Sequence, residues 1–104
     1  MAVVKLKIDH NCLRLRLTAD DLRELAAEGE LAETTNIGGA SLTYALEPGN
    51  GPAVTADFVD TRINVVVPRE LLEKWANGDD IAIEASQPPL RILIEKDLGR
   101  GRSS

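Results

Sequence analysis

The fold is decided by residues 62–95, which read RINVVVPRELLEKWANGDDIAIEASQPPLRILIE. Apolar residues alternate up to a proline, which is typical of a half-buried strand followed by the first turn of a helix. The helix is expected to bury Leu71, Leu72 and Trp75. A Gly78-Asp79 turn then ends it, and two further apolar strands follow. This stretch predicts a small β-rich unit with one short helix.

The first half of the chain repeats this pattern about 50 residues earlier. Strands are predicted over 2–8, 12–17, 31–35 and 41–47, and a helix from Thr18 to Gly29 that buries Leu22, Leu25 and Ala26. In the second half, 54–58 and 62–67 are the matching first strands. The last strands match after a two-residue slip. The aligned apolar pairs are Val4/Val54, Leu6/Ala56, Ile8/Phe58, Leu13/Ile63, Leu15/Val65, Leu17/Val67, Leu22/Leu72, Leu25/Trp75, Ala26/Ala76 and Leu31/Ile81.

Two matching halves predict an internal duplication with a pseudo-twofold axis. We expect a mainly β (α+β) fold, a single-chain β-barrel built from two ββαββ repeats on one shared core. Residues 1–96 form the expected single domain, with repeats over 2–47 and 53–96. The proline- and glycine-rich residues 48–52 are the expected linker, and 97–104 are expected to form a flexible tail.

Composition narrows the class of protein. The chain has 104 residues, 43% of them hydrophobic, a net charge of −5 and only three aromatic residues. Its one cysteine cannot form an internal disulfide, and no apolar run reaches the roughly 20 residues of a membrane-spanning helix. Because the N-terminus also lacks the apolar core of a signal peptide, we expect a cytoplasmic protein. The negative net charge disfavours nucleic acid as a partner.

The stretch around Pro68 resembles the AbrB-like swapped-hairpin family. The matching residues are Pro68, Leu71, Gly78, Asp79, Ile81 and Ile83. In the first half Thr18 replaces the proline, and Glu28-Gly29-Glu30 stands in place of the Gly-Asp turn. The resemblance implies a barrel of the swapped-hairpin or cradle-loop type. It also implies binding to DNA as a transcription regulator or antitoxin, through basic residues of the N-terminal hairpin.

The whole chain is also similar to a family of small uncharacterised bacterial proteins. The matching segments are LRLRLT (13–18), LTYALE (42–47), VPRELLEKWA (67–76) and LRILIEKD (90–97). This resemblance implies no activity. Its members are expected to continue beyond the end of this chain, so any function of such a segment would be absent here.

The predicted N-terminal hairpin carries four basic residues on one face: Lys5, Lys7, Arg14 and Arg16. Like charges that face each other across strands are destabilising, so these side chains need compensation. Acidic residues on neighbouring strands, such as Glu33, Glu47 or Asp57, are the favoured source. The alternative is an anionic partner, which makes the four residues a candidate binding face.

Other candidate sites are weaker. His10 and Cys12 are the only histidine and cysteine, and they are weak candidates as metal ligands or as a base and nucleophile. A turn at 9–11, with Asn11 in a left-handed conformation, explains the same residues without a site. Residues 37–41 are glycine-rich but lack the Lys-Ser/Thr ending of a phosphate loop. Neither a metal nor a cofactor is predicted.

Three classes of function follow from these observations. The favoured hypothesis is a non-enzymatic binding module for an unknown protein or small ligand, as a monomer or weak homodimer, without contact to a membrane. The second is an AbrB-like DNA-binding regulator that uses the basic hairpin face. The third is a small enzyme centred on His10 and Cys12, which would need a third group to orient the base.

Overall fold

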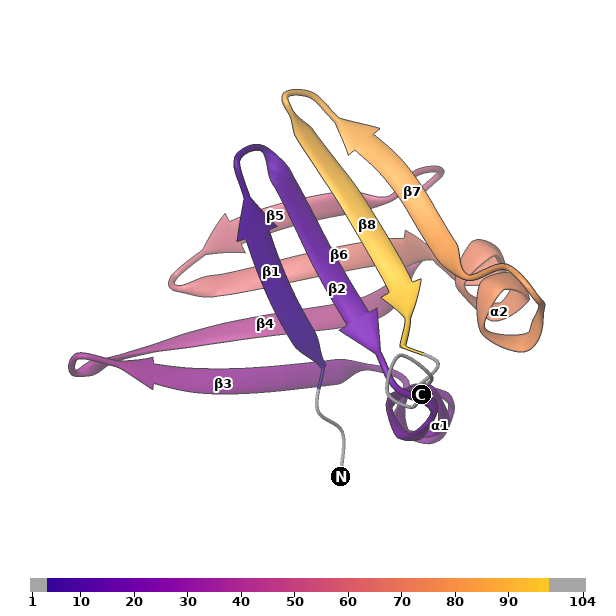
Figure 1. Ribbon diagram of the computed structural model, residues 1–104, viewed down its shortest axis with the longest axis horizontal. Helices are drawn as coiled ribbons and strands as arrows, with labels where there is room; N and C mark the ends of the chain where they lie inside the picture. The colour runs from indigo at the N-terminus through magenta and orange to yellow at the C-terminus, as the bar shows by residue number, and fades with distance from the viewer. Residues whose placement is uncertain (1–3, 98–104) are drawn as a thin grey trace.

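The computed structural model describes residues 4–97 (Figure 1). Within them the chain is mainly β, as predicted. The elements in order are β1 (Lys5–Asp9), β2 (Cys12–Leu17), α1 (Ala19–Glu28), β3 (Leu31–Ile37), β4 (Ala40–Gly49), β5 (Thr55–Val59), β6 (Arg62–Pro68), α2 (Arg69–Asn77), β7 (Ala82–Gln87) and β8 (Leu90–Lys96). The first residues of the predicted strand 2–8, and the predicted tail from residue 98 onward, lie outside the described residues.

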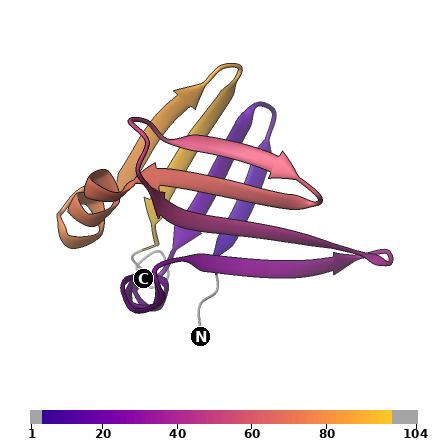
Figure 2. The same ribbon diagram turned by 180° about the vertical axis from the view of Figure 1, so that it is seen from behind.

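The strands form two four-stranded sheets. The first sheet has the order β1-β2-β8-β7 and the second β3-β4-β6-β5. Each sheet therefore joins a hairpin from the first half of the chain to a hairpin from the second. The central pairs, β2 with β8 and β4 with β6, are parallel, and the outer pairs are antiparallel. Figures 1 and 2 show the strands of the two sheets crossing each other, with the sheets stacked face to face.

The prediction of one closed barrel is wrong. Among residues 4–97 no backbone ladder joins the two sheets, and side chains make the connections instead. The Tyr44 hydroxyl donates a hydrogen bond to the Val4 carbonyl oxygen at 2.9 Å. The Gln87 amide donates to the Ala56 carbonyl at 2.9 Å and accepts from the Ala56 N–H at 3.0 Å. Alternation in a sequence tells which face of a strand is buried, but not whether two sheet edges meet.

Tyr44 gives the fold a specific pH dependence. Burial, and to a smaller extent the negative charge of Glu33, raise the pKa of Tyr44 above 10.0. The neutral phenol is thus favoured in the folded state, so this stabilisation is complete below about pH 10 and is lost as the pH rises through the folded pKa. We expect the free energy of unfolding, measured by urea denaturation, to fall more steeply above pH 10 in the wild type than in Tyr44→Phe. Since Tyr44 is the only tyrosine, its absorbance titration is the control, and an ionisation at or below the ordinary pKa would contradict the prediction.

The core lies between the two sheets, where alternate residues of the central strands are buried as predicted. These are Leu13, Leu15 and Leu17 in β2 and Ile63, Val65 and Val67 in β6. Ile92 and Ile94 of β8 are fully buried beside them. Ile8 and Phe58 continue the apolar alternation of their strands, yet 58% and 67% of their surfaces are exposed. Both lie next to a hairpin turn on an edge strand, where the facing sheet does not cover them.

The helix α1 begins and ends as its sequence predicts. The Thr18 side chain accepts from the Asp21 N–H, and the Asp21 carboxylate accepts from the Thr18 N–H, which forms a capping box. Gly29 ends the helix in a left-handed conformation with φ 84°. Leu25 is buried and Leu22 half-buried, but Ala26 is exposed and not part of the core.

The helix α2 follows Pro68 and ends at Gly78, also as predicted. A Cβ atom at Gly78 would lie only 2.7 Å from the Lys74 carbonyl oxygen, so glycine is needed there. Leu72 and Trp75 are buried, whereas 40% of the Leu71 surface is exposed. Leu71 lies about 100° around the helix from Leu72, and its side chain falls outside the part of the helix surface that faces the core.

Two connections differ from the prediction. In the first hairpin turn His10, and not Asn11, has positive φ, at 60°. The linker covers residues 50–54 and not 48–52, because β4 continues to Gly49, where its last residues pair with the end of β6, and β5 begins only at Thr55. Pro48 remains in the strand because its carbonyl oxygen can still accept a hydrogen bond from the parallel neighbour, β6.

Candidate functional site

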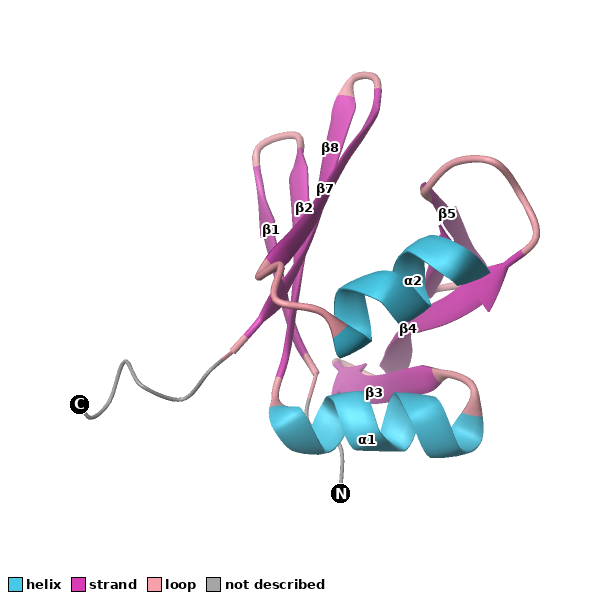
Figure 3. Ribbon diagram, turned by 90° about the vertical axis from the view of Figure 1, so that its right-hand side faces the viewer, coloured by secondary structure: helices cyan, strands magenta, loops and turns pink. Residues whose placement is uncertain are grey.

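The two helices enclose a groove. Each helix connects one sheet to the other, α1 between β2 and β3 and α2 between β6 and β7. They lie next to each other on the same side of the molecule (Figure 3). The groove between them has a volume of about 490 Å³ and is lined by residues of both helices, together with Pro48 at the end of β4.

The floor of the groove is apolar. Leu22, Leu25 and Ala26 of α1 lie on one helix face at i, i+3 and i+4, and Leu72 and Ala76 of α2 lie opposite. Leu25 and Leu72 are buried, whereas Ala26 is exposed. Because two of the facing residues are alanines, the side chains leave space that leucines would fill.

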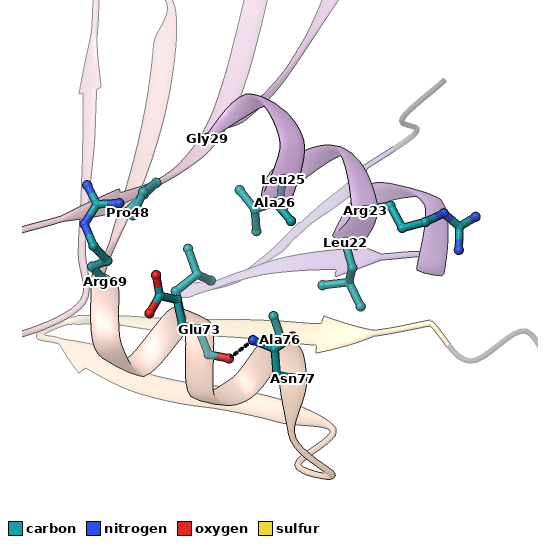
Figure 4. A pocket seen from close by; sticks show the side chains of 11 residues that line it. Leu22, Arg23, Leu25, Ala26, Gly29, Pro48, Arg69, Glu73, Ala76 and Asn77 are labelled. Carbon is teal, nitrogen blue, oxygen red and sulfur yellow. Dashed lines mark hydrogen bonds between the residues drawn. The ribbon is translucent and has the colours of Figure 1, made fainter.

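Polar side chains lie at both ends of the groove (Figure 4). Arg69 and Glu73 lie at the end next to Pro48 and Gly29, and Arg23 and Asn77 lie at the other. Arg23 is paired with Asp20. The Asn77 amide donates to the Glu73 carbonyl oxygen at 3.0 Å. The side chains of Arg69 and Glu73 make no ion pair or hydrogen bond within residues 4–97.

Sequence reasoning missed this groove. It assigned Ala26 to the core and did not single out Arg69 or Glu73. The available signal was the alignment of Ala26 with Ala76 on two helices, because small residues at matching positions mark where two helices face each other across limited space.

The four basic candidates share the outer face of the first hairpin, where Lys5 pairs across the strands with Arg16, and Lys7 with Arg14. Their acidic neighbours come from the other end of the chain. The Glu95 carboxylate lies 3.6 Å from Arg14 Nε and 4.0 Å from Arg16 Nε, and Asp97 lies 3.9 Å from Lys5 Nζ. For Lys7, no ion pair occurs among the described residues.

The acidic residues expected on this face lie elsewhere. Glu33, Glu47 and Asp57 belong to β3, β4 and β5 of the second sheet, whereas the neighbour of β2 is β8. The parallel pairing of Arg16 with Glu95 joins residues about 80 positions apart, which no local pattern indicates. Ion pairs of such exposed side chains contribute about 0–1 kcal/mol each. They reduce the positive charge that the face offers to an anionic partner.

His10 and Cys12 lie at the tip of the same hairpin. His10 is exposed in the turn, and Cys12 is half-buried beside Asp9 and Arg91 in the sheet register. In the part of the chain that the structure describes, no three His, Cys, Asp or Glu side chains lie close enough together to hold a metal ion. Neither α1 nor α2 is long and apolar enough to cross a membrane.

Comparison with known protein families gives a match over nearly the whole chain. A family model described as a family of unknown function (DUF7009) covers residues 4–99. No curated protein matches the chain. Nothing in this match, or in the described residues, points to an enzyme or to DNA binding.

Proposed function

The chain belongs to this family of unknown function, and we propose that it is a non-enzymatic binding module whose binding site is the groove between α1 and α2. The observation that carries the proposal is the groove itself. Its volume of about 490 Å³ lies within the roughly 300–1,000 Å³ of ligand pockets in proteins. Like such pockets, it has an apolar floor and a few polar groups at its rim.

The energetics favour a small, partly apolar ligand. Covering each 100 Å² of apolar surface contributes about 2.5 kcal/mol, and association costs at least about 4 kcal/mol. Because Leu25 and Leu72 are already buried, the gain comes mainly from Leu22, Ala26 and Ala76 and from the ligand. We therefore expect affinities in the micromolar range or weaker. A protein partner would have to insert a side chain between the helices.

We further propose that the domain over 1–96 arose by duplication, and that a pseudo-twofold axis relates its halves and passes between the two helices. A strand register and the strand order of the sheets support this. Lys5 pairs with Arg16 in the first half as Thr55 pairs with Val66 in the second, 50 residues later in both strands. The strand order β1-β2-β8-β7 becomes β5-β6-β4-β3 when each strand is replaced by its counterpart. The interleaved hairpins also agree with the swapped-hairpin arrangement that the AbrB-like resemblance implies.

The proposed function is tested by filling the groove. Ala26→Trp places a large side chain between the helices, and because Ala26 is exposed the fold should tolerate it. The dye ANS, an aromatic sulfonate whose fluorescence increases in apolar surroundings, is expected to fluoresce on binding to the wild type. We expect Ala26→Trp to lower the affinity for ANS at least about tenfold, which corresponds to about 1.4 kcal/mol.

The matched control is Ala27→Trp, which changes the next exposed alanine of α1, outside the groove. It should bind ANS like the wild type. Unchanged binding in Ala26→Trp, or equal loss in both variants, would show that the dye binds elsewhere. Dispersed NMR amide signals in both variants would show that a change in ANS binding does not come from a partly unfolded state.

A further inference from the structure

Two opposite charges without an ion pair in the described chain lie at one end of the groove. Arg69 and Glu73 are one helical turn apart on α2, both exposed, and both line the groove (Figure 4). An i, i+4 pair with the basic residue first is the less favourable order for a helical ion pair. An internal Arg69–Glu73 bond is therefore a weak competitor for either side chain.

The position of Arg69 does not benefit its own helix. Arg69 is the first residue of α2, and the positive end of the helix dipole disfavours a cation there. A structural role for Arg69 would lie across the groove, at the end of α1. There Gly29 ends the helix at the negative end of its dipole, and the last turn of α1 has no basic residue that would offset this charge. Such a role predicts an effect on stability, whereas a binding role predicts an effect on affinity. The two can be measured separately.

Arg69 and Glu73 together favour a ligand that carries both a negative and a positive charge. A guanidinium binds a carboxylate through two parallel hydrogen bonds, and a carboxylate accepts hydrogen bonds from an ammonium group. A purely anionic ligand would be repelled by Glu73, and a purely cationic one by Arg69. Arg23 at the opposite end of the groove is already paired with Asp20, so it adds no unpaired charge that would affect which ligand binds.

We propose that the groove binds a small aliphatic zwitterion of the amino-acid or dipeptide type. Arg69 holds the carboxylate, Glu73 holds the ammonium group, and the aliphatic part lies on the floor against Leu22, Leu72 and Ala26. A groove of about 490 Å³ has room for a ligand of this size. This assignment rests on the proposed function of the same groove.

The test is calorimetric titration with three probes that carry the same two leucine side chains: leucyl-leucine, N-acetyl-leucyl-leucine, which lacks the ammonium group, and leucyl-leucinamide, which lacks the carboxylate. The dipeptide is expected to bind the wild type at least about tenfold more tightly than either singly charged probe. Arg69→Gln and Glu73→Gln should each lower its affinity about tenfold or more. Lys74→Gln is the control, because Lys74 is exposed on the same helix but does not line the groove.

Each other outcome overturns the assignment. If leucyl-leucine does not bind while ANS binds and Ala26→Trp blocks it, the groove is a binding site but not for zwitterions. If N-acetyl-leucyl-leucine or leucyl-leucinamide binds as tightly as leucyl-leucine, the two charges of the groove do not select the ligand. If Arg69→Gln lowers the melting temperature and leaves dipeptide affinity unchanged, Arg69 serves the end of α1. Failure of ANS and all three probes alike would reject the proposed function itself.

Discussion

Separated within the linker, residues 1–51 and residues 52–104 are each expected to remain unfolded in solution. Neither half can build a sheet of the native protein alone, because every sheet needs one hairpin from each half. Separation removes both parallel pairings, including the contact of Leu15 with Ile94, two residues that are almost fully buried. A chain of about 50 residues also buries too little surface to offset its conformational entropy.

Circular dichroism and NMR amide dispersion of each half measure this directly. An equimolar mixture of the two halves is the informative control. It should regain dispersed amide signals, since the parallel pairings can form between separate chains. A half that unfolds cooperatively by itself would contradict the single shared core and would mean that the repeats are independent domains.

The elements were predictable because their signals are local. The strand β2 has its predicted bounds, and α1 lies between the predicted cap at Thr18 and the predicted stop at Gly29. A hydroxyl two residues before an acidic pair, and a glycine after the last turn, act within a few residues of the chain. The alternation that buries Leu15 and Val65 is local in the same sense.

The arrangement of the sheets was less predictable because it depends on contacts between distant residues. No local pattern indicates that the two sheets connect through the Tyr44 hydroxyl and the Val4 carbonyl oxygen and not through a backbone ladder. The partners of the basic face were missed for the same reason, since Glu95 reaches Arg14 only through the parallel pairing of β2 with β8. The groove depends on how the two helices are placed relative to each other, and the sequence of one helix does not determine this.

Trp75→Ala is expected to lower the free energy of unfolding by roughly 3–5 kcal/mol. Trp75 is 2% exposed and belongs to the main core cluster. It is also one of only two buried residues of α2, the other being Leu72. The Lys96 Nζ lies 5.4 Å from the centre of the indole ring, and this cation–π contact would be lost as well. Urea denaturation followed by circular dichroism measures the change.

Two further variants make the Trp75 result specific. Lys74→Ala alters the neighbouring exposed residue and should change the free energy of unfolding by less than about 0.5 kcal/mol. Trp75→Phe should cost less than Trp75→Ala, because it keeps much of the apolar volume and removes an indole N–H that is buried without a hydrogen-bond partner among the described residues. A loss below about 1 kcal/mol in Trp75→Ala would mean that α2 is not anchored by the tryptophan. If the anchor is real, Trp75→Ala should also weaken ANS binding, because α2 forms one wall of the groove.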